Sequence, residues 1–126
     1  MPAPNDLSWE QLQSAFAQLG INNIINGSTA NGIYRINFDL SEVVSVGSLR
    51  DPGVIKFISK LLDACRIAQE RVNLDENGNL KPAGERLDAF PPPTTGTIVV
   101  GQVPIIKSVR TRSDLSSATR ITGATA

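Results

Sequence analysis

The sequence predicts an α+β fold, in which a small antiparallel sheet is packed by one long amphipathic helix and a short N-terminal helix. Two segments repeat apolar residues at the spacing of a helix face, and a segment between them alternates apolar and polar residues like a half-buried strand. After Phe90 the composition changes to a proline run, an apolar stretch and a tail of small residues. We therefore expect a compact α+β domain over residues 1–90, a proline-rich hinge over 91–96 and an extended basic arm over 97–126.

Length and composition limit what the chain can do. Its 126 residues suggest one domain, its single cysteine excludes an intrachain disulfide, and its lack of histidine excludes histidine-based catalytic triads and dyads within the chain. No apolar run approaches the ~18 residues that span a bilayer, and the N-terminus lacks the features of a secretory signal. We expect no membrane span, no cofactor and no metal, and a location in the cytoplasm or within an assembled particle.

A first helix is predicted over residues 9–19. Ser8 is a suitable N-cap, and Gln11 three residues later completes a capping box. An apolar face follows at helical spacing, and Gly20 permits the left-handed turn that ends a helix. The apolar positions of this face are Trp9, Leu12, Phe16 and Leu19.

A strand is predicted over residues 33–40, where apolar residues alternate with polar ones. Its inward face would carry Tyr34, Ile36, Phe38 and Leu40. Two Asn-Gly pairs before it, at 26–27 and 31–32, both favour turns, and a brief strand at 24–25 is expected before the first turn. Three valines at 43, 44 and 46 would extend the strand or form a second one.

The long helix is predicted over residues 52–73, with Asp51 as N-cap and Pro52 at the first helical position. Its apolar stripe is wide, which favours packing on the chain's own sheet and leaves additional packing on another subunit open. Cys65 lies on that stripe, where a cysteine behaves as a small apolar residue. We expect it to be structural rather than nucleophilic.

Residues 74–80 are predicted to form a hairpin tip at Asn77-Gly78. The alternation of Asp75, Asn77 and Asn79 resembles the start of a calcium-binding EF-hand loop. That loop needs glycine at its sixth position and glutamate at its twelfth, where this chain has Leu80 and Arg86. The pattern therefore favours the hairpin tip.

The region after Phe90 carries the main functional expectation. Pro91, Pro92 and Pro93 favour a stiff extended hinge, and residues 97–109 are strand-like but interrupted by Pro104, which indicates an edge strand or a break between two short strands. Residues 111–126 are rich in small polar residues and are expected to be mobile when isolated. We expect the arm to gain its order from contact with another molecule rather than from residues 1–90.

Charge supports a protein partner more than a nucleic acid. Residues 94–126 carry four basic side chains and one acidic one, a net +3, while the whole chain is neutral. The basic residues have no aromatic neighbours on which bases could stack, which argues against nucleic acid as a partner.

The sequence therefore predicts a non-enzymatic structural subunit of a homo-oligomeric assembly (a virion, tail-like particle, tube or shell), whose partners are copies of itself or other structural subunits. A small regulatory or adaptor module that binds another protein is the alternative. An enzyme that uses carboxylates alone is a weaker one, since Asp39, Glu42, Asp88 and Asp114 show no paired spacing. We expect the interface to include the proline hinge, apolar residues of the arm and its arginines: Pro91, Pro92, Pro93, Ile98, Val100, Val103, Ile105, Arg110, Arg112 and Arg120.

Overall fold

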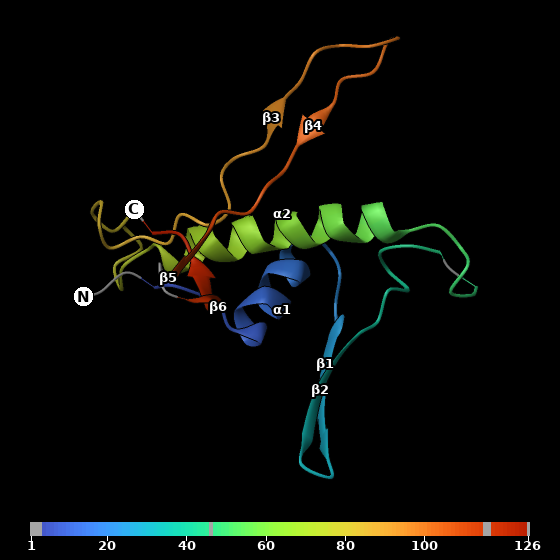
Figure 1. Ribbon diagram of the computed structural model, residues 1–126, viewed down its shortest axis with the longest axis horizontal. Coiled ribbons are helices and arrows are strands. Elements are labelled where there is room, and N and C mark those ends of the chain that lie inside the picture. The colour runs from blue at the N-terminus through green and yellow to red at the C-terminus, as the bar shows by residue number, and fades with distance from the viewer. Residues whose placement is uncertain (1–3, 46, 115–116, 126) are drawn as a thin grey trace.

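Two helices cross at the centre of the molecule, and antiparallel hairpins extend from them (Figure 1). The computed structural model describes residues 4–45, 47–114 and 117–125, and the side chains of residues 113–120 lie outside that description. The α+β class is confirmed, although the described strands form three separate two-stranded ladders rather than one sheet. The elements are α1 (Trp9–Gln18), β1 (Ile25–Ala30), β2 (Ile33–Phe38), α2 (Val54–Val72), β3 (Thr94–Thr95), β4 (Ile105–Ile106), β5 (Thr111–Asp114) and β6 (Ser117–Gly123).

Helix α1 forms as the sequence predicts. The Ser8 hydroxyl accepts a hydrogen bond from the Gln11 backbone N–H at 3.1 Å, and the Gln11 side chain accepts one from the Ser8 N–H at 2.8 Å. This reciprocal capping box satisfies backbone donors that the first helical turn leaves unpaired. The helix ends where Gly20 adopts a φ of 80°.

Helix α2 lies within the predicted range, but the predicted N-cap is wrong. The cap is Gly53, which has no side chain to bond the first turn. The Asp51 carboxylate instead accepts hydrogen bonds from the backbone N–H groups of Gly47 and Ser48 in the preceding loop. A Cβ at position 53 would lie 3.2 Å from the carbons of Val44, so glycine allows the start of α2 to pack closely on that valine.

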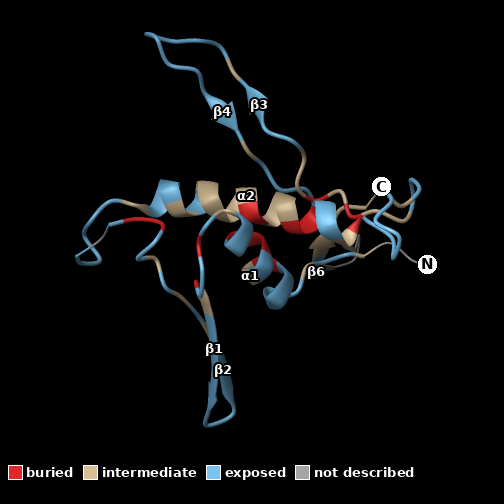
Figure 2. Cartoon of the chain, turned by 180° about the vertical axis from the view of Figure 1, so that it is seen from behind, coloured by how far each residue is buried: buried red, intermediate tan, exposed pale blue. Residues whose placement is uncertain are grey.

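The core lies between α1, α2 and the loop that connects β2 to α2 (Figure 2). Phe16 of α1 and Ala64 and Ala68 of α2 are fully buried, and the small alanines let the two helices approach closely. Val43 and Val44 are buried in a turn rather than in the predicted strand, and Val46 lies outside the described residues. A chain of edge-to-face aromatic contacts runs from Trp9 through Phe38 to Phe57, with ring centroids 6.2 and 5.2 Å apart.

The β1–β2 hairpin projects from this core and reverses at Asn31-Gly32, where φ is 54° and 73°. The other predicted turn, at Asn26-Gly27, is wrong, because both residues lie in β1 and pair with β2. Burial of the predicted inward face is limited to the base of the hairpin. Phe38 at the end of β2 is half-buried on the core, whereas Tyr34 near the tip is exposed.

The C-terminal segment has two parts that behave differently. Residues 94–106 project as a hairpin, while the β5–β6 hairpin returns to the body of the chain (Figure 1). The Arg110 N–H donates to the Ala89 carbonyl at 2.6 Å, and the Asp88 N–H donates to the Ala124 carbonyl at 2.8 Å. The expectation that the whole arm takes its order from another molecule is therefore wrong for this second part, because residues 87–89 provide backbone partners that a composition argument does not reveal.

Candidate interaction surface

The hairpin over residues 94–106, called here the β3–β4 hairpin, is the main candidate interaction surface. Thr94 pairs with Ile106 and Thr95 with Ile105, and the Gly96 N–H donates to the Pro104 carbonyl at 2.9 Å. Val99 and Gln102 exchange backbone hydrogen bonds of 3.0 Å each across a two-residue turn. The predicted strand over 97–109 is thus the tip and the returning half of a hairpin.

This hairpin is apolar, uncharged and exposed. No residue from 94 to 106 is ionisable, and the side chains of Ile98, Val100 and Ile105 are 66%, 96% and 63% exposed. Val103, also predicted at the interface, is exposed as well. An isolated two-stranded hairpin is marginally stable in water, and a contiguous exposed apolar patch marks an interaction site. Its exposed apolar side chains make the β3–β4 hairpin a candidate interaction surface.

The tip of the hairpin has an unusual backbone. Its central residues, Val100 and Gly101, have φ values of 49° and 75°. Positive φ at both positions is typical of a type I′ turn, which strongly prefers Asn-Gly. A β-branched valine in this conformation is an outlier that costs roughly 1–2 kcal/mol. The chain thus keeps an apolar side chain at the apex where local backbone energetics favours a polar one.

The root of the hairpin is held by α2. The Lys107 ammonium lies 2.8 Å from an Asp63 carboxylate oxygen and donates to the Ser59 hydroxyl at 2.7 Å. Both charged side chains are largely shielded, with 22% and 20% exposure, so solvent screens this pair less than a surface pair. The contact fixes the place on α2 from which the hairpin departs.

A second contact with α2, made by Gln69, holds the backbone just before the proline hinge. The buried Gln69 side chain accepts hydrogen bonds from the N–H groups of Ala89 and Phe90 and donates to the Phe90 carbonyl, over 2.7–2.9 Å. Pro91 follows and is half-buried, and Pro92 and Pro93 are exposed. The prolines therefore connect the segment fixed on α2 to β3. Because proline restricts the backbone, they can set the direction in which the hairpin leaves α2.

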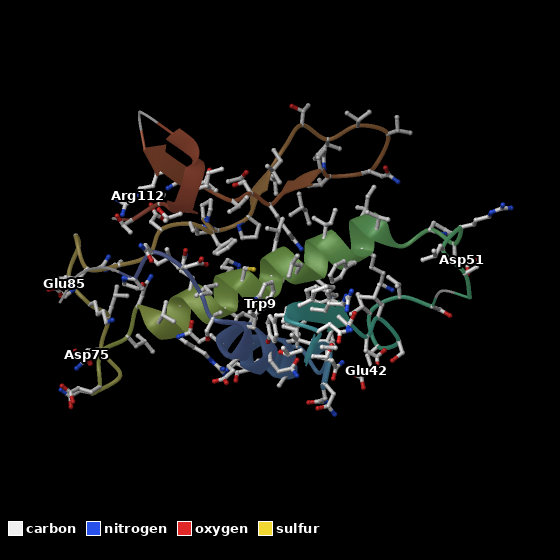
Figure 3. All side chains as sticks on the ribbon, turned by 60° about the horizontal axis from the view of Figure 1, so that its bottom comes forward. Trp9, Glu42, Asp51, Asp75, Glu85 and Arg112 are labelled. Carbon is white, nitrogen blue, oxygen red and sulfur yellow. The ribbon has the colours of Figure 1, made fainter. Side chains whose placement is uncertain are left out.

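Two of the predicted interface arginines, Arg110 and Arg112, contact their own chain rather than the hairpin. Arg110 forms an ion pair with Asp88 at 2.8 Å, and Arg112 donates to the hydroxyls of Thr122 and Thr125 at 3.2 and 3.3 Å. The side chain of Arg120 lies outside the described residues. Figure 3 places Arg112 at the opposite end of the molecule from Asp51.

A second apolar surface lies at the start of α2 and was not predicted. A cavity of about 190 Å³ opens there, and Leu49 beside it is fully exposed, with 106% relative exposure. The sequence signal for this site is the cluster of apolar residues in the first two turns of α2. This apolar face is wider than the part of it that packs on the core. We call it the α2 socket, and its apolar lining comprises Leu40, Val44, Leu49, Val54 and Phe57.

The ionisable groups support structural contacts. Burial, together with the nearby charge of Asp6, raises the pKa of the Cys65 thiol to about 11, so it stays protonated at neutral pH. Hydrogen bonds from the backbone and side chain of Ser41 lower the pKa of Asp39. Glu42 accepts a hydrogen bond from the Asn22 N–H, and Asp88 pairs with Arg110. These carboxylates therefore stabilise loops and the C-terminal return of the chain.

Two further features concern the described residues alone. Within residues 4–45, 47–114 and 117–125, histidine, cysteine and acidic side chains form no group of three that could hold a metal ion. No helix in the same part of the chain combines the length and apolar character required to cross a bilayer.

No protein family, curated protein or solved structure matches this chain.

Proposed function

We propose that this protein is a non-enzymatic structural subunit of a homo-oligomeric assembly, such as a virion, tail-like particle, tube or shell, and that its subunits contact one another through the β3–β4 hairpin. The observation that carries the proposal is the exposure of that hairpin. Thirteen consecutive residues without a charge leave the body of the chain and present valine and isoleucine side chains to solvent. Covering such side chains removes apolar area from water, which is the main driving force for association.

The anchors at the root favour a constitutive role for the hairpin. Lys107 on one side and Gln69 with the prolines on the other fix both ends of the hairpin to α2. An element that is held in its binding orientation loses less conformational entropy when it docks. An arm anchored at the same place on every copy suits an assembly in which the same contact is repeated.

The test measures the mass of the protein by size-exclusion chromatography with light scattering over a wide concentration range. We expect the wild type to form a multi-subunit species and the variant Ile98→Ser/Ile105→Ser to remain monomeric. Both substituted side chains are exposed, so the fold of the monomer should be retained, which circular dichroism can verify.

The matched control is Leu74→Ser/Leu80→Ser, which removes two exposed apolar side chains from the loop after α2. We expect this control to associate like the wild type. A wild type that stays monomeric at the highest concentration would contradict the proposal and favour the adaptor alternative, in which the hairpin binds a different protein.

A further inference from the structure

We infer that the tip of the β3–β4 hairpin of one copy docks into the α2 socket of a second copy, with Val100 as the inserted side chain. The inference rests on the proposed function and specifies its contact. It names a donor and an acceptor on different parts of the same chain. When two copies do not exchange tips reciprocally, such a contact is heterologous and generates rings or filaments rather than closed dimers.

The two surfaces match in charge. The hairpin carries no ionisable residue from Thr94 to Ile106. In the lining of the socket the one ionisable residue is Asp51, whose carboxylate already accepts the N–H groups of Gly47 and Ser48. The tip therefore brings no charge of its own to the socket, and the Asp51 carboxylate there already holds two backbone hydrogen bonds.

The two surfaces also match in size. The socket has a volume of about 190 Å³, below the roughly 300–1,000 Å³ of typical small-molecule sites. It can accept one or two aliphatic side chains but not a helix or a large ligand. Val100, 96% exposed at the apex of a tight turn, presents such a side chain on a narrow support.

Side-chain docking also fits the hairpin better than strand addition. Pro104 has no N–H, so it removes a donor from one edge of the hairpin. The regular ladder is only two residue pairs long, which offers few backbone groups to an added strand. At the tip, Val100 is 96% exposed and has a φ of 49°, which is unfavourable for valine. An apolar contact with a neighbouring copy would cover this side chain and would explain why a valine stands at this position.

The hairpin and the socket stay apart within one copy. Figure 1 shows the β3–β4 hairpin rising away from α2 to end clear of the helix, and the socket lies at the start of α2 on the body of the chain. The side chain at the tip therefore needs a neighbouring copy to reach a socket.

The first experiment uses Val100→Asn. Asparagine is the preferred residue at this turn position, so the substitution retains the hairpin while removing the apolar side chain. We expect it to weaken self-association by about tenfold or more, as the loss of one buried valine predicts. We expect Leu49→Asp, on the socket side, to weaken it further, and Leu80→Asp, an exposed apolar site elsewhere, to leave it unchanged.

The second experiment identifies the contact. Two proteins carrying Cys65→Ala, one with Val100→Cys and the other with Leu49→Cys, are mixed and oxidised. We expect the mixed disulfide to form in preference to either symmetric one, because a disulfide requires the Cα atoms to lie within about 7 Å. A single chain with both new cysteines should give a ladder of covalent oligomers.

Three results would overturn the inference: predominant cross-links between two Val100→Cys chains, cross-links within one dilute chain, or normal association of both Val100→Asn and Leu49→Asp. If the wild type associates while one of these holds, the proposed function stands and this contact is wrong. If the wild type does not associate at all, both fail.

Discussion

The side-chain amide of Asn73 makes both hydrogen bonds of the buried Leu87 backbone: its oxygen accepts from the Leu87 N–H and its nitrogen donates to the Leu87 carbonyl, each at 2.8 Å. One helical turn earlier, Gln69 makes equivalent contacts to Ala89 and Phe90. Two amide side chains at the end of α2 thus act as the neighbouring strand for the segment that leads into the proline hinge. This arrangement satisfies buried backbone groups without a sheet.

Replacing Asn73 with alanine should be strongly destabilising. The Leu87 N–H and carbonyl would remain buried without partners, and each such group costs roughly 1–3 kcal/mol. We expect Asn73→Ala to lower the free energy of unfolding by about 2–4 kcal/mol in urea titrations. Asn37→Ala, at an exposed position of β2, is the control and should change it by less than about 0.5 kcal/mol. Equal effects would show that the contacts to Leu87 contribute little.

The shielded ion pair at the root of the β3–β4 hairpin should contribute more to the free energy of unfolding than an exposed ion pair. Lys107→Met leaves the Asp63 carboxylate, 20% exposed, without its cation, and we expect a loss of about 1–3 kcal/mol in the free energy of unfolding. Arg66→Met breaks the i,i+4 pair with Glu70, whose carboxylate is 65% exposed, and should cost less than about 0.5 kcal/mol. A smaller effect at Lys107 than at Arg66 would contradict this ranking.

The glycines of the two Asn-Gly pairs in the β1–β2 hairpin should respond differently to alanine. Gly32 has a φ of 73°, so Gly32→Ala strains the β1–β2 turn and should destabilise the hairpin by about 1 kcal/mol. At Gly27 an added Cβ would meet the hydroxyl end of the Tyr34 side chain, which can move aside, so Gly27→Ala should cost less. Hydrogen exchange of the hairpin amides measures both, because a projecting hairpin opens locally. Faster exchange in Gly27→Ala than in Gly32→Ala would contradict this prediction.

The Cys65 thiol gives a pH-dependent prediction. Burial raises its pKa from about 9 to about 11, so between these values the folded protein holds a proton that the unfolded chain has lost. This contribution to stability is therefore fully present below pH 9 and is lost as the pH rises toward 11. Cys65→Ala should show a smaller fall in the free energy of unfolding over this range than the wild type.

Alkylation provides an independent measure of the same thiol. Since the thiolate is the reactive form, native Cys65 should react slowly with iodoacetamide at pH 8, and the reaction should accelerate as the pH approaches 11. The urea-unfolded protein is the control, and its reactivity should rise near pH 9. Equal rates for native and unfolded protein at pH 8 would show that burial does not protect the thiol.

Interactions between residues close in sequence were predicted well. The capping box of Ser8 and Gln11 and the turn at Gly78 depend on residues three or four positions apart, and the structure confirms both. Helical periodicity likewise placed α1 and α2 to within about two residues at each end. The choice between the Asn-Gly pairs was not predictable in this way, because both have the same local turn preference and strand pairing decides between them.

By itself, the sequence determined the two helices, the α+β class and the absence of charge from residues 94–106, because periodicity, capping and composition act through neighbouring residues. Only the tertiary structure decided that Arg110 pairs with Asp88, that Asn73 binds the Leu87 backbone and that the α2 socket lies open beside Leu49. These contacts join residues 14 or more positions apart or depend on which side chains the core leaves uncovered. Hydrogen-bond geometry and burial select such partners only when the whole chain has packed.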